Sequence, residues 1–193
     1  VSAAHRTAGA GILINGGSGC SIEQCDIEGD SFAGIYVNAG GTTSSGTGSL
    51  SITGNYMEGQ TRSIYILGDA TASVRGIHIS GNFISGQELA YCLYGIYCVY
   101  AVGLVIEGNA IINHQTNAIY IGGAISNASV RSNSLTSSVG GWVDMFLNST
   151  ATGLFDTGGI LQSTRLIGVN SGISFPATQV PDAGPNVLDD YEE

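Results

Sequence analysis

Apolar and polar positions follow a six-residue pattern in this chain, and the pattern returns at a nearly constant spacing. Each copy begins and ends with an apolar residue and has Asn in its fourth place, preceded by a small or polar residue. The copies are Ile52–Met57, Ile79–Ile84, Ile106–Ile111 and Val130–Leu135, and their asparagines are 27, 27 and 24 residues apart. A period of this size predicts a repeat architecture with one copy in each coil.

The two apolar ends of each copy are five residues apart, which in a continuous strand would place them on opposite faces. The chain therefore has to bend between them if both are to reach one core. We expect Asn to be the bend, because it tolerates the left-handed conformation and its amide can bond the Asn one coil away. Weaker copies place Cys25 and Gly158 at the Asn position.

A second pattern precedes each copy. In it, two apolar residues flank one residue whose side chain would point to the other face of the strand. This is the alternation of a strand with one buried side, and it recurs at Ile12–Ile14, Ile35–Val37, Ile64–Ile66, Ile96–Cys98 and Ile119–Ile121. Each coil should hold about three short strands and stack on the next at about 4.8 Å. We predict an all-β fold, a right-handed parallel β-helix of about seven coils over residues 1–174.

The last segment, residues 175–193, departs from the repeat. It holds all three prolines, and five of its last twelve residues are acidic. We expect the β-helix to end near Ser174 and this segment to be extended, leading to a C-terminal module outside the chain. Because the first residues contain neither an initiator Met nor an apolar leader, we also expect a fragment of a longer protein.

Composition narrows the possible partners. The 193 residues include 30 Gly, no Lys and a formal net charge of -10, so a phosphate backbone would be repelled and nucleic-acid binding is not expected. Apolar runs are too short for a membrane span of roughly 18 residues.

His5, His78 and His114 stand on different turns, so we expect no metal site and no cofactor. Of the four cysteines we expect buried free thiols, with a Cys92–Cys98 bridge as the alternative.

One outward column of the first strands is aromatic. In the predicted frame it runs through Leu13, Tyr36, Tyr65, Tyr97, Tyr120 and then Asp144. Four tyrosines about 5 Å apart would form a flat wall edged by hydroxyl groups, suited to sugar rings or to another subunit. Sugar binding, a subunit interface and simple stabilisation by stacking remain open at this point.

A carboxylate pair is the clearest candidate for catalysis. Glu28 and Glu58 each stand three residues after the expected bend, so both should point outward from adjacent coils. Neighbouring carboxylates repel, which favours one protonated and one ionised group, the arrangement of a retaining glycosidase. Asp144 beside the tyrosines is a second candidate acid. The alternative is a solvated acidic patch.

The acidic segment also carries a family resemblance. Phe175–Gln179 (FPATQ) and Leu188–Glu193 (LDDYEE) resemble a segment common in tailspike and tail-fibre proteins of tailed bacteriophages and prophages, in which a pectate-lyase-like β-helix leads to a C-terminal module. The family usually continues into a Gly-Thr-Trp module that this chain lacks. The resemblance implies a homotrimer on the virion tail that binds, and in many members depolymerises, bacterial surface polysaccharide outside the cell.

These observations leave several functional hypotheses. The first is a tailspike domain that recognises surface polysaccharide, with hydrolysis of glycosidic bonds by Glu28 and Glu58 as its enzymatic form. Hydrolysis is favoured over elimination because the chain lacks Lys and the clustered Asp that a calcium-dependent lyase would need. The alternatives are a non-catalytic shaft of a trimeric fibre and a bacterial surface adhesin.

Overall fold

The computed structural model describes residues 9–29, 32–39, 47–87, 89–136, 145–147, 151–155 and 168–169. Asp144, residues 175–193 and most of the Phe155–Ile160 copy lie outside this part of the chain. Within it, no helix has the length and hydrophobicity of a membrane span.

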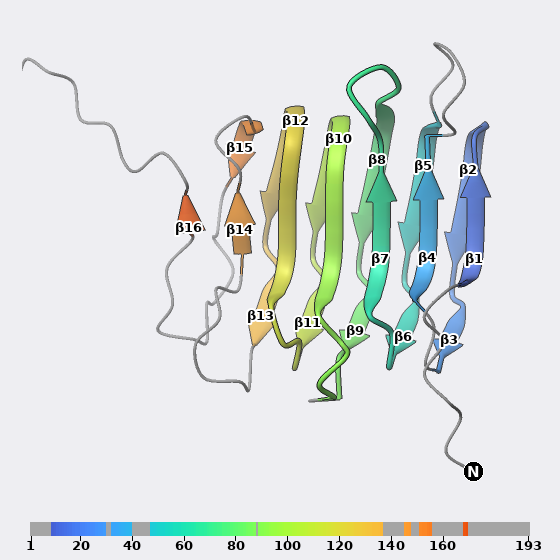
Figure 1. Cartoon of the computed structure of the whole chain (residues 1–193), viewed down its shortest axis with the longest axis vertical. Coiled ribbons are helices and arrows are strands. Elements are labelled where there is room, and N and C mark those ends of the chain that lie inside the picture. The colour runs from blue at the N-terminus through green and yellow to red at the C-terminus, as the bar shows by residue number, and fades with distance from the viewer. Residues whose placement is uncertain are drawn as a thin grey trace, which may run out of the picture.

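The described strands form two parallel sheets that wind around one tube (Figure 1). The short sheet stacks one three-residue strand from each coil, in the order β3 (Asp26–Glu28), β6 (Tyr56–Glu58), β9 (Phe83–Ser85), β11 (Ala110–Ile112) and β13 (Ser134–Thr136). The long sheet contains β1 (Ala10–Asn15), β2 (Ser18–Glu23), β4 (Ala33–Asn38), β5 (Gly48–Thr53), β7 (Arg62–Leu67), β8 (Val74–Ser80), β10 (Tyr94–Glu107), β12 (Asn117–Arg131), β14 (Met145–Leu147), β15 (Ala151–Phe155) and β16 (Gly168–Val169).

This arrangement confirms the predicted parallel β-helix, with a difference in the number of coils. Five rungs of the short sheet are described, which gives four full turns from β3 to β13 where about seven coils were expected. The first three coils have the three predicted strands. In the fourth and fifth coils the first two strands are continuous, as β10 and β12. The bend between them appears only as a shift of register between Val99 and Ala101.

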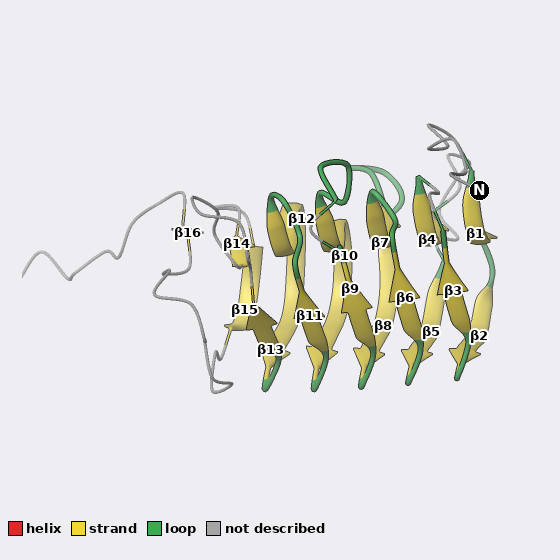
Figure 2. Ribbon diagram, turned by 90° about the horizontal axis from the view of Figure 1, so that it is seen from below, coloured by secondary structure: helices red, strands yellow, loops and turns green. Residues whose placement is uncertain are grey.

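The core is a set of stacked apolar columns inside the tube. One column runs along the short sheet through Ile27, Met57, Ile84, Ile111 and Leu135, and its members are register partners from coil to coil. Burying each such side chain contributes roughly 1.5–3 kcal/mol. Figure 2 shows the three-residue strands of the short sheet stacked in one row along the tube. Because successive residues of a strand point to opposite faces, the residues on either side of the buried column point outward.

The asparagine ladder is present as predicted. Asn55, Asn82, Asn109 and Asn133 are buried, and each side-chain amide donates to the Oδ1 of the next at 2.9 Å. The same Oδ1 atoms accept from backbone N–H groups, beginning with Cys25 at 3.0 Å. This ladder satisfies buried polar groups at every turn between the sheets.

The bend itself lies one residue earlier than expected. The left-handed residue is the one before each ladder position, with φ of 53° at Gln24, 65° at Gly54, 61° at Gly81, 63° at Gly108 and 54° at Ser132. The prediction that Asn takes this conformation was wrong. The bend turns the Asn side chain into the tube, where its amide reaches the next coil. Glycine adopts the left-handed conformation at the lowest energetic cost, which explains its place before Asn in three of the copies.

Candidate functional site

The outer face of the short sheet concentrates carboxylates at its N-terminal end. Asp26 and Glu28 flank the inward Ile27 on β3, and Tyr56 and Glu58 occupy the same positions on β6. Glu28 is the register partner of Glu58, and Asp26 of Tyr56. The prediction that the two glutamates neighbour one another on one face is therefore confirmed, with Glu28 exposed and Glu58 half-buried.

Tyr56 is tied to this carboxylate group. Its hydroxyl donates a hydrogen bond to Glu58 Oε2. That bond, reinforced by partial desolvation and by the charges of Glu58, Glu28 and Asp26, raises the pKa of Tyr56 to about 12. The phenol therefore remains a neutral donor across the physiological range and holds the Glu58 carboxylate in place.

An exposed aromatic pair adjoins the carboxylates. Tyr56 and Phe83 are register partners in β6 and β9, with ring centroids 5.4 Å apart and planes 7° from parallel. They are 36% and 40% exposed. The next residue of this column is Ala110, so among the described residues no ring stacks on the other side of Phe83. The pair lies next to the acidic residues, and its uncovered ring face belongs to Phe83 and points toward β11, on the side away from Asp26 and Glu28.

The tyrosine column of the long sheet has a different geometry. Tyr36, Tyr65, Tyr97 and Tyr120 are register partners in β4, β7, β10 and β12, as the sequence predicted. Tyr36 stacks on Tyr65 with centroids 4.8 Å apart, and Tyr97 on Tyr120 at 4.4 Å. Between the two pairs the rings meet edge to face, at 81°. At these distances the rings cover each other's faces, so the column presents mainly edges and hydroxyl groups instead of a flat wall.

The register of the tyrosine column corrects one prediction made from the sequence. Phe146 on β14 follows Tyr120 in register and stacks on it at 5.1 Å. Asp144 was expected at that place, two residues earlier in the chain, and its own position lies outside the described residues. The difference arises where the chain leaves β13 and returns to the long sheet at β14, because the length of a connection is not encoded in the repeat.

Arg62 lies at the centre of the aromatic cluster, which comprises the tyrosine column with Phe32, Tyr94 and Phe146. Its guanidinium carbon is 4.9 to 5.5 Å from the ring centroids of Phe32, Tyr65, Tyr94 and Tyr97. Its Nε is buried without a hydrogen-bond partner, so cation–π attraction is its principal compensation there. Burial raises the pKa of Tyr65, and raises that of Tyr97 to about 12. The hydroxyl groups of these two tyrosines remain neutral.

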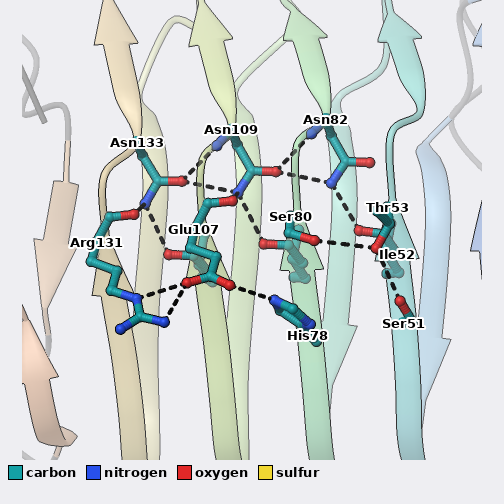
Figure 3. A network of polar contacts seen from close by, with 12 residues as sticks. Ser51, Ile52, Thr53, His78, Ser80, Asn82, Glu107, Asn109, Arg131 and Asn133 are labelled. Atoms are coloured by element: carbon teal, nitrogen blue, oxygen red, sulfur yellow. Dashed lines mark hydrogen bonds and ion pairs between the residues drawn. The ribbon is translucent and has the colours of Figure 1, made fainter.

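An open groove lies on the outer face of the long sheet, where β8, β10 and β12 neighbour one another. It has a volume of about 390 Å³ and is lined by Gly76, Ile77, His78, Gly103, Val105, Glu107 and Arg131. Glu107 links His78 and Arg131 (Figure 3), accepting from His78 Nε2 at 2.9 Å and from Arg131 Nε at 2.7 Å. Hydrogen bonds from Arg131 and then His78 lower the pKa of Glu107.

A row of hydroxyl groups continues from this groove toward the N-terminal coils. Thr53 Oγ1 lies 2.9 Å from Ser51 Oγ and 3.2 Å from Ser80 Oγ. Ser51 is the register partner of His78, and Ser80 of Glu107. Charged groups and hydroxyls therefore share one continuous outer surface (Figure 3).

Comparison with known proteins assigns the architecture. The family model described as the right handed beta helix region matches residues 2–155. The chain belongs to the right-handed β-helix family. No curated protein and no solved structure gives a match to this β-helix.

Two groups on the β-helix surface were missed by sequence reasoning, although a signal for each exists. Thr53, Ser80, Glu107 and Arg131 all hold the second place of the six-residue pattern, so an acid and a base in successive copies have to be neighbours. Tyr56 and Phe83 likewise share the fifth place of successive copies. Comparing equivalent positions across all the copies would have revealed both pairs.

The four cysteines form no disulfide, so the alternative Cys92–Cys98 bridge is absent. Cys92 and Cys98 are buried as expected, whereas Cys20 and Cys25 are only half-buried. Burial raises the pKa of the Cys98 thiol well above its usual value. Across the described coils, no three His, Cys, Asp or Glu side chains lie close enough together to hold a metal ion.

Proposed function

We propose that this right-handed β-helix recognises bacterial surface polysaccharide through the outer face of its short sheet. The observation that carries the proposal is the exposed Tyr56–Phe83 pair beside Asp26, Glu28 and Glu58. An aromatic face packs against the apolar C–H side of a sugar ring, while carboxylates accept hydrogen bonds from its hydroxyl groups. Domains of this family often bind or degrade carbohydrate, which agrees with the proposal.

We place the domain in a tailspike or tail fibre that acts outside the host cell. This part of the proposal rests on the resemblance of Phe175–Gln179 and Leu188–Glu193 to the exit segment of such proteins. The acidic surface, with a net charge of -10, suits exposure to solvent and gives no affinity for nucleic acid.

Hydrolysis of the bound glycan is the enzymatic form of this proposal. Glu28 and Glu58 are register partners on neighbouring strands, whose spacing is about 4.8 Å. A retaining glycosidase uses two carboxyl groups about 5–5.5 Å apart, one as acid and one as nucleophile. Glu58 accepts the Tyr56 hydrogen bond and suits the nucleophile, which leaves Glu28 as the acid. Asp144 remains a prediction for a further acid.

The test is incubation of the 193-residue chain with capsule and lipopolysaccharide from a panel of bacteria, followed by chromatography of the products. We expect binding to at least one polymer, weakened about tenfold by Phe83→Ala, a change of about 1.4 kcal/mol. Ser134→Ala is the matched control, because Ser134 is exposed in the same outward column of the short sheet, two coils beyond Phe83. A panel with no bound polymer would refute the recognition proposal.

Catalysis is tested in the same experiment by the double variant Glu28→Gln, Glu58→Gln. Release of defined oligosaccharides by the parent chain, and their loss in the double variant, is the expected result for a hydrolase. Bound but intact polymer would exclude hydrolysis by this chain and leave recognition alone.

The aromatic cluster supports a second proposal, a homotrimer in which this face contacts the neighbouring subunits. Its half-buried tyrosines surround one arginine, and aromatic residues and Arg are enriched at the centre of protein interfaces while Lys and Glu are depleted. On this proposal the tyrosines are structural. Direct sugar binding by Tyr36, Tyr65, Tyr97 and Tyr120, the sequence prediction, would have to use ring edges and hydroxyl groups.

A further inference from the structure

The outer layer of side chains on the long sheet has a gap in two successive coils. One outward column consists of Gly19, Ser49, Gly76, Gly103 and Asn127, all with φ between 54° and 72°. Ser49 and Asn127 carry side chains in this conformation, whereas Gly76 and Gly103 between them have none. The two glycines form the floor of the groove described above. The opening spans the strands from β8 to β12, about 10 Å.

Space above these glycines is open. A Cβ added at Gly103 would find its nearest neighbour, the Gly76 nitrogen, at 3.7 Å, and one added at Gly76 would find the Ser49 nitrogen at 3.5 Å. Neither glycine is needed to let other protein atoms approach closely. The missing side chains therefore leave room for a ligand to lie on the backbone.

The charged wall of the groove offers both hydrogen-bond donors and acceptors. Glu107 is fixed by Arg131 Nη2 at 2.6 Å and His78 Nε2 at 2.9 Å. Because a carboxylate only accepts, the His78 Nε2–H donates, which leaves Nδ1 of a neutral His78 as an acceptor. Arg131 has five N–H donors in total, more than Glu107 occupies. A ligand hydroxyl placed here could donate to one group and accept from its neighbour.

The charge of the wall decides between ligand classes. Glu107 and Arg131 neutralise one another, and the whole chain carries a net charge of -10. An anionic group would have to displace Glu107 from Arg131 or lie beside it and be repelled. Uncharged hydroxyl groups encounter no such cost. Two adjacent hydroxyls can bridge a carboxylate and the cation paired with it.

We infer that the groove between β8 and β12 is a binding site for a neutral pyranose, held through adjacent hydroxyl groups by His78, Glu107 and Arg131. The inference rests on the proposed recognition of polysaccharide and adds a ligand class and a second surface to it. The groove has a volume of about 390 Å³ and is open to solvent, so a bound ring would keep one side exposed.

The test is an NMR titration of the 193-residue chain that follows the His78 imidazole signals, assigned with His78→Gln. Methyl α-D-mannopyranoside is the neutral probe with adjacent hydroxyls, and D-glucuronate is the anionic probe. We expect a saturable shift in the millimolar range with the neutral probe and at least tenfold weaker binding of glucuronate. Preference for glucuronate, or no shift with the neutral probe, would overturn the inference.

Two variants tie the response to the groove. Gly103→Asn fills the floor and keeps the backbone, because Asn127 has φ of 54° at the equivalent place in the next coil. Glu107→Gln removes the central acceptor. Each should weaken binding of the neutral probe about tenfold or more. Glu23→Gln is the matched control, since Glu23 occupies the same outward column three coils earlier and lies outside the groove.

The polysaccharide panel separates this inference from the proposed function. If the parent chain binds a polymer and the pyranoside, but Gly103→Asn binds the pyranoside equally well, the groove assignment fails and recognition of polysaccharide stands. If no polymer binds while the groove still binds the neutral pyranoside, the recognition of polysaccharide fails and the groove assignment stands.

Discussion

At the scale of single residues, His114 is a buried titratable group whose pKa depends on the fold. It lies between β11 and β12 and is 2% exposed. Desolvation lowers its pKa from 6.5 to about 4. The folded chain therefore holds His114 neutral at pH values where the unfolded chain protonates it.

This shift predicts a pH-dependent loss of stability. Because the pKa of His114 is lower in the folded state, the chain keeps its full unfolding free energy above about pH 6.5. Part of that free energy is lost as the pH falls toward 4. The loss approaches about 3 kcal/mol of unfolding free energy at the acidic end. Urea unfolding from pH 7 to pH 4 measures it. His114→Gln should flatten the profile relative to the parent chain, and identical profiles would show that His114 does not contribute.

At the scale of elements, the turn between the two sheets depends on contacts between coils more than on any single strand. Each strand of the short sheet has only three residues, too few to be stable alone. Asn82 links three coils: its amide donates to Asn109 Oδ1 and to the Ile52 carbonyl, while its Oδ1 accepts from Asn55. The ladder thus holds successive coils in register.

Removal of the central amide should be costly. Asn82→Ala leaves the backbone N–H and the side-chain amide of Asn55 without their shared acceptor inside the tube. Two orphaned buried donors cost about 1–3 kcal/mol each. We expect a loss of about 3 kcal/mol in chemical unfolding. Ser134→Ala, exposed and next to the ladder, should change little, and equal effects of the two variants would contradict a special role for the ladder.

At the scale of the whole molecule, the two sheets present surfaces of different chemistry. The short sheet carries carboxylates and an open ring face, while the long sheet carries the aromatic cluster around Arg62 and, separately, the groove beside Glu107. This division suits a subunit that contacts its neighbours with one face and glycan with others.

The oligomer is the prediction that belongs to this scale. Sedimentation equilibrium should give three times the chain mass of 19.7 kDa. Tyr97→Ala, within the aromatic cluster, should shift the chain toward monomer, while Tyr56→Ala, a tyrosine of the other sheet, should not. A parent chain that is monomeric at every concentration would refute the trimer. The tyrosines would then serve only to stabilise the stacked coils.

The sequence by itself determined the features that the repeat encodes. A six-residue pattern repeated in each coil, with Asn or Cys25 in its fourth place, predicts stacked coils, a buried amide ladder and the pairing of Glu28 with Glu58, because equivalent positions of stacked coils have to be neighbours. The aromatic column through Tyr36 and Tyr120 follows from the same rule.

Only the tertiary structure decided how side chains in these columns meet. The left-handed residue precedes Asn because the amide has to turn inward, and this depends on the neighbouring coil. The tyrosine rings stack on one another and around Arg62, so their faces are not free. Phe146 replaces Asp144 in register since the connection before β14 lies outside the repeat. A periodic pattern specifies which residues are neighbours, whereas ring orientation, connection length and the open groove depend on packing in three dimensions.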